Sequence, residues 1–157
     1  MLSPDDRLAR RPRTPALDPL GRWASTVATP MPLDCTMDIT LNKDGVDVTV
    51  LDGPYLAAGK PTPRAVADYT RLIEQVESRK GFAADKLLDL YNDTWVDEDI
   101  GEVDRAGFIN RLTKPAVHLY DEIGAAVVYF EDGGLFAGHY IEISIDDGQP
   151  TDAHIAG

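Results

Sequence analysis

The amino-acid sequence predicts an α+β fold: a mainly antiparallel sheet of about five strands with two or three helices packed on it. Apolar and polar residues alternate near both ends of residues 37–157, which is the period of a half-buried strand. Between these ends, apolar residues recur at helical spacing. A chain of 157 residues with 43% apolar content can bury one sizeable core. Residues 37–157 are therefore expected to form a single domain.

Residues 1–36 are expected to be a Pro/Arg-rich tail that is ordered in part at most. Six prolines fall in this segment, and proline removes a backbone donor and fixes φ, which disfavours regular elements. Cys35 is the chain's single cysteine, so an internal disulfide is impossible. We interpret Cys35 as a small apolar filler, because a nucleophilic cysteine needs a base and no histidine lies near it in the sequence.

The first regular element expected is a β-hairpin over residues 37–50. Apolar and polar side chains alternate in residues 37–42 and 46–50, and the intervening residues 43–45, Lys-Asp-Gly, give a turn signal. The alternation places the apolar residues on one face. The hairpin should therefore cover a core on one side and meet water on the other.

Three helices are expected to follow. Thr62 suits the N-cap and Pro63 the first position of a first helix. Gly81 is expected to interrupt the helical pattern before a second helix, which ends near Trp95. Asp104 is expected to cap a short third helix.

The rest of the chain reads as β-structure. Side chains alternate in residues 117–120 and 140–145, and a short strand at 153–155 is expected to complete the sheet. Residues 125–130 are apolar at every position, which indicates a central strand covered on both faces.

The C-terminal half carries an ordered set of motifs: KLLDLYNDTW at residues 86–95, DED at 97–99, FINRL at 108–112, YFEDGGLFAGHYIEI at 129–143 and TDAHIAG at 151–157. In these motifs the chain resembles a bacterial family catalogued as domain of unknown function twenty-two sixty-two. The resemblance covers about residues 82–157 and implies a compact α+β domain without an assigned activity. Small acidic bacterial proteins of this kind are often immunity proteins that neutralise toxins, an analogy of size and charge that rests on no motif.

The net charge is −12, and it is spread unevenly. Residues 1–22 hold five Arg against three Asp, so the +2 of this segment leaves −14 for the rest of the chain. Such a body repels nucleic acid and anionic lipid, because phosphate binding needs clustered Lys and Arg. It attracts a basic protein partner instead. With no apolar run long enough to span a bilayer and no secretory signal, a cytoplasmic location is expected.

The expected partner-binding surface is a loop that is rich in carboxylates. It follows Trp95, which either folds back on the core or serves as an exposed interface anchor. Its acidic residues are Asp97, Glu98, Asp99, Glu102 and Asp104. Their spacing does not match a helix–loop–helix calcium loop, which needs Gly rather than Glu at the sixth position. No metal, cofactor or catalytic residue is expected.

Two alternative functions remain open from the sequence. A small hydrolase or metal-dependent enzyme could be built from His139, Glu131 and Glu142, although His139 shares parity with the apolar residues of its strand and is expected to be buried and hydrogen-bonded. A self-associating structural domain would need an exposed apolar patch. That patch would consist of Leu135, Phe136 and Tyr140.

Overall fold

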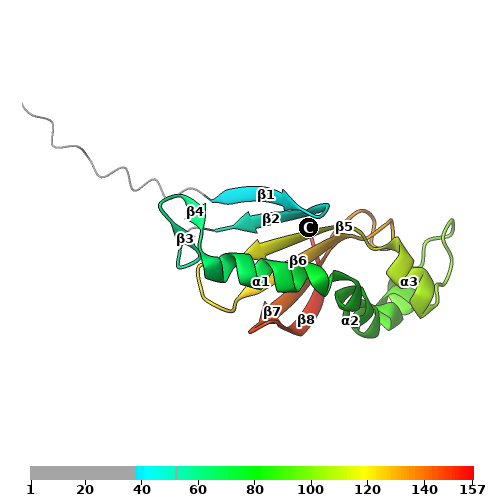
Figure 1. Ribbon diagram of the computed structural model, residues 1–157. Coiled ribbons are helices and arrows are strands. Elements are labelled where there is room, and N and C mark those ends of the chain that lie inside the picture. The colour runs from blue at the N-terminus through cyan, green and yellow to red at the C-terminus, as the bar shows by residue number, and fades with distance from the viewer. Residues whose placement is uncertain (1–37, 52) are drawn as a thin grey trace, which may run out of the picture. The chain divides into compact units, whose positions relative to one another are not determined.

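The computed structural model describes residues 38–51 and 53–157, which form a six-stranded sheet with helices on one face (Figure 1). The order of strands in the sheet is β1-β2-β5-β6-β7-β8. These strands are β1 (Ile39–Lys43), β2 (Val46–Val50), β5 (Thr113–Leu119), β6 (Ala126–Glu131), β7 (Tyr140–Asp146) and β8 (Gln149–Ala156). The expected tail at residues 1–36, with Cys35, lies outside the described residues. The α+β prediction is confirmed.

The sheet is antiparallel except at one junction, where β2 and β5 run parallel. A parallel pair needs a long crossover, and here the crossover contains all three α-helices together with the small ribbon of β3 (Leu56–Ala57) and β4 (Lys60–Pro61). The remaining neighbours are joined by hairpins, as the turn signals predict. The sheet is therefore an N-terminal hairpin placed beside a four-stranded C-terminal meander.

The first two helices are consecutive. In α1 (Pro63–Glu74) the side chain of Thr62 accepts a hydrogen bond from the amide of Ala65 at 3.2 Å, as expected for its N-cap. The break to α2 (Val76–Leu90) falls at Gln75. The predicted interruption at Gly81 is wrong, because α2 runs through it; Arg105 crosses there and donates to the Gly81 carbonyl at 3.3 Å.

The C-terminal end of α2 widens into a π-helical turn, η1 (Tyr91–Trp95), and a loop then leads to α3 (Arg105–Arg111). Asp104 caps α3 as predicted, since its carboxylate accepts a hydrogen bond from the amide of Gly107 at 2.7 Å. In the described part of the chain, no helix is both long and apolar enough to cross a membrane.

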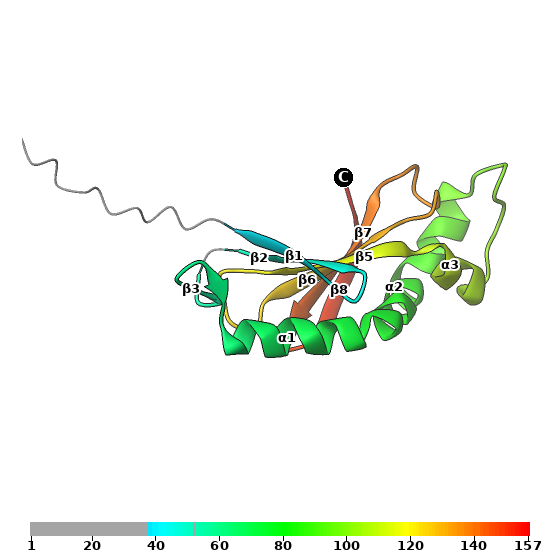
Figure 2. The same ribbon diagram turned by 45° about the horizontal axis from the view of Figure 1, so that its top comes forward.

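The core lies between the helices and one face of the sheet (Figure 2). Alternate residues of β2, β5, β6 and β7 point into it, including Val48, Val117 and Ile143, none of which is exposed. Among the described elements, none lies over the other face, which we call the open face. Residues 125–130 were predicted to be covered on both faces, but no described element lies over the open face, where Val127 is nevertheless buried at 6% exposure and Tyr129 is half-buried.

Candidate functional site

The chain from α2 to α3 forms a well-braced projection at the end of the domain away from β3 and β4 (Figure 1). Tyr91 is fully buried, and its hydroxyl donates to the carbonyl of Gly101 at 2.9 Å. The side-chain amide of Asn92 donates to the Val103 carbonyl at 2.9 Å and accepts from the Val103 amide at 3.0 Å. These three bonds fasten the loop to η1, so the acidic loop has a defined conformation.

A turn inside the loop fixes the carboxylates further. The amides of Ile100 and Gly101 both donate to the carbonyl of Asp97, and the carboxylate of Asp97 accepts from the amide of Asp99 at 2.8 Å. Residues 89–104 contain seven acidic residues and no basic one, and all seven acidic side chains are exposed. This segment holds the five acidic residues singled out from the sequence: Asp97, Glu98, Asp99, Glu102 and Asp104.

Three large apolar side chains are exposed among these carboxylates. Leu90 and Val96 are each 40% exposed, and Trp95 is 36% exposed. One edge of Trp95 packs on the buried Phe136, with ring centroids 5.6 Å apart. The indole is therefore held in place while part of it faces solvent, between the two alternatives considered from the sequence. We call residues 89–104 the acidic–apolar surface.

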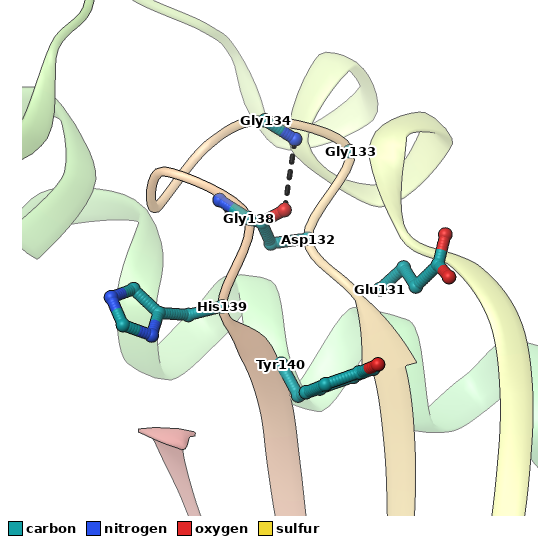
Figure 3. Close-up of a pocket in the computed structure, with 7 residues that line it drawn as sticks. All are labelled: Glu131, Asp132, Gly133, Gly134, Gly138, His139 and Tyr140. Carbon is teal, nitrogen blue, oxygen red and sulfur yellow. Dashed lines mark hydrogen bonds between the residues drawn. The ribbon is translucent and has the colours of Figure 1, made fainter. Parts of the chain in front are cut away.

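His139 does not occupy the buried position expected from its parity. It precedes β7, is half-buried, and stacks edge-to-face on Trp95 with centroids 6.1 Å apart. The residue that fixes the loop between β6 and β7 is Asp132, which is only 2% exposed. Its carboxylate accepts a hydrogen bond from the amide of Gly134 at 2.9 Å (Figure 3) and further hydrogen bonds from the amides of Phe136 and Gly138 at 2.6 and 3.1 Å. The Asp-Gly-Gly sequence reads as an ordinary turn and gives no sign of this role.

The three residues of the alternative enzyme site are not assembled. Glu131 and His139 border one hollow of about 260 Å³, but their side chains point to opposite sides of it (Figure 3). Glu131 pairs with Lys114 at 2.8 Å. Glu142 lies on the open face, where its carboxylate is 3.4 Å from His154 Nε2. Among the described residues, no group of three His, Cys, Asp or Glu side chains is placed to hold a metal ion.

A second cluster, which the sequence does not single out, lies on the open face. His118, Tyr129 and Glu142 come from neighbouring strands, with Tyr129 and Glu142 directly opposite each other in the β6–β7 register. Burial lowers the pKa of His118, and the charge of Glu142 partly opposes this. Burial raises the pKa of Tyr129 well above its ordinary value, and the contact with the Tyr120 hydroxyl at 3.4 Å adds to the effect. Alternation along each strand indicates on which face of the sheet these three residues lie. Only the register between the strands shows that they are neighbours.

The apolar patch required by the self-association alternative is not present. Leu135 and Phe136 belong to the core, with exposures of 1% and 0%, and only Tyr140 is exposed.

Comparison with known proteins gives one match. A family model described as "Uncharacterized protein conserved in bacteria (DUF2262)" matches residues 58–155, which is well over half of the chain and extends the resemblance to include α1. No curated protein matches. No solved structure matches either.

Proposed function

The chain belongs to the uncharacterised bacterial family DUF2262, and we propose that it is a binding domain that docks a basic protein partner through the acidic–apolar surface. The observation that carries the proposal is the coincidence of seven exposed carboxylates with three exposed apolar side chains on one braced segment. Charge by itself would serve solubility. A docking surface also needs an apolar anchor, and Trp95, which is partly exposed among the carboxylates, would provide it.

The carboxylates would act before contact. A body with a net charge of −12 and a dense acidic end attracts a Lys/Arg-rich surface over a Debye length, about 10 Å at 0.1 M salt. Such steering raises the association rate and orients the encounter. Because all seven carboxylates are exposed, salt would screen this effect, and binding would be strongest at low ionic strength.

The apolar residues would act after contact. Trp95 is supported from behind by Phe136, so it loses little side-chain freedom when a partner covers it. Leu90 and Val96 are the other exposed apolar side chains of the segment, and their burial would add to the desolvated centre. Acidic residues would then form the polar rim that surrounds an interface core.

We further infer that the partner is a bacterial toxin and that the chain acts as its immunity protein by steric occlusion. A toxin that acts on nucleic acid or phosphate-bearing substrates needs a basic active site. The acidic–apolar surface would cover such a site without chemistry of its own. This step rests on charge complementarity and on the analogy with other small acidic bacterial proteins.

The test is a pull-down from host lysate at low salt, with the products of neighbouring genes co-expressed. Three forms of the tagged protein are compared: wild type, the triple variant Asp97→Lys, Asp99→Lys, Glu102→Lys, and a control with the same charge change at other exposed acidic sites. The control substitutions are Glu74→Lys, Glu122→Lys and Asp152→Lys. A basic protein that wild type and control retain and the loop variant loses supports the proposal. Equal retention by both variants contradicts it, because location would then not matter.

A further inference from the structure

The open face of the sheet contains a hollow of about 400 Å³ lined by Ala116, His118, Tyr129 and Tyr140, which we call the aromatic hollow. Its volume is within the range of small-molecule sites, roughly 300–1,000 Å³. The lining residues come from β5, β6 and β7, so the walls are fixed by the sheet rather than by a loop. The hollow lies on the face of the sheet opposite the helices, and none of its lining residues belongs to the acidic–apolar surface.

The register explains why a hollow forms there. Ala116 lies directly opposite Tyr129 in the β5–β6 ladder, and its methyl group leaves the space beside the larger ring empty. His118 packs against Tyr129 with ring centroids 4.7 Å apart and a tilt of 55°. Tyr140 is 50% exposed and forms the outer wall. Apart from the small Ala116, the lining residues all carry rings.

The charge beside the hollow is negative. Glu142 is two residues along β7 from Tyr140 and directly opposite Tyr129, and its side chain is only 20% exposed. The nearby ammonium of Lys114 is paired with Glu131 at 2.8 Å. Because burial lowers the pKa of His118, its imidazole is neutral at pH 7 and does not repel a cation. Glu142 in turn is 3.4 Å from the exposed His154, which lies outside the lining.

We propose that the aromatic hollow binds the methylated ammonium group of a small organic cation. Ring faces attract a cation through their quadrupoles, and Glu142 adds a full negative charge close to the rings. A primary ammonium needs hydrogen-bond acceptors to replace its water, and three ring walls offer few of them. A quaternary ammonium has no N–H group and loses only weak hydration, so the hollow favours methylated cations.

The experiment is an NMR titration of the full chain with choline, followed through backbone amide shifts. Two probes serve as controls: dimethylbutanol, the uncharged isostere in which carbon replaces nitrogen, and ethanolamine, which carries a primary ammonium. Saturable shifts at residues 116–118, 129 and 140–142 are expected with choline. Both controls should bind at least about tenfold more weakly, given the size of a cation–π contribution. If dimethylbutanol bound as tightly as choline, the hollow would be a plain apolar site and the proposal would be overturned.

Variants locate the site. Tyr140→Ala removes an exposed wall that is not part of the core, and Glu142→Gln removes the charge while keeping the shape. Each should weaken choline binding about fivefold or more, whereas Glu74→Gln, the same charge change on α1 at the other face of the sheet, should leave it unchanged. Shifts that do not saturate, or a choline affinity that is unchanged in Tyr140→Ala, would overturn the proposal. Because the test uses no protein partner, its failure leaves the proposed docking function untouched, and the reverse also holds.

Discussion

Asp132 shows how one buried carboxylate can organise a whole connection. It accepts hydrogen bonds from three amides of the β6–β7 loop, and that loop carries Phe136, on which Trp95 packs. Asp132→Ala should leave these amides without an acceptor and lower the free energy of unfolding by about 2–4 kcal/mol. Urea denaturation measures this. The exposed Asp152→Ala should change stability by less than about 0.5 kcal/mol, and an equally small effect at Asp132 would contradict the assigned role.

His118 makes a second prediction at the scale of one residue. Burial lowers its pKa below the ordinary 6.5, so the unfolded imidazole takes up a proton at higher pH than the folded one. The contribution of His118 to stability is therefore complete above about pH 6.5 and is lost as the pH falls below it. An NMR titration of the imidazole C–H signals should give a midpoint below 6.5. Glu142→Gln should lower the midpoint further, because the carboxylate favours the protonated ring; a rise would contradict this geometry.

At the scale of elements, the β6–β7 connection depends on close packing against the end of α3. A Cβ on Gly133 would lie 2.3 Å from the carbonyl oxygen of Arg111, and the residue has φ +58°. Gly138 also has positive φ, at +85°, but nothing lies within 4 Å of its would-be Cβ. Gly138→Ala should lower the free energy of unfolding by about 1–2 kcal/mol, because alanine disfavours the left-handed conformation. Gly133→Ala should lower it clearly more, because the backbone of Arg111 must also move. Equal losses of stability in urea denaturation would exclude the steric explanation.

The elements themselves were largely predictable, because local patterns determine them. Alternation gave the strands, and the caps at Thr62 and Asp104 form as expected. Gly81 was misread because its role is tertiary: it leaves room for Arg105, which a single helix pattern cannot reveal. His139 was misread because the alternation along a strand indicates the face on which a side chain lies but not how deeply it is buried. The residue lies just before β7, past the edge of the core, so a position on the core side still leaves it only half-buried.

At the scale of the whole molecule, strand order was the part that local patterns could not supply. The parallel pairing of β2 with β5 spans the whole helical crossover, and no motif in either strand encodes it. That pairing places the N-terminal hairpin beside the meander and leaves one sheet face free of the described helices. The clustering of His118, Tyr129 and Glu142 is a consequence of register. The exposure of the acidic residues between 97 and 104 was predictable, because this loop is continuous in sequence.

The proposed docking function, with exposed carboxylates around the partly exposed Trp95, predicts that two kinds of substitution will act on different rate constants of partner binding. Charge reversal at Asp97, Asp99 and Glu102 should slow association about tenfold at low salt and flatten its salt dependence, because steering is lost. Trp95→Ala should leave association and its salt dependence nearly unchanged but speed dissociation, with a loss of about 2 kcal/mol, because the anchor acts only in the formed complex. Surface plasmon resonance of the captured partner at several salt concentrations separates the two effects. If both variants altered only dissociation, the carboxylates would be ordinary contact residues, and long-range steering by this end of the domain would be refuted.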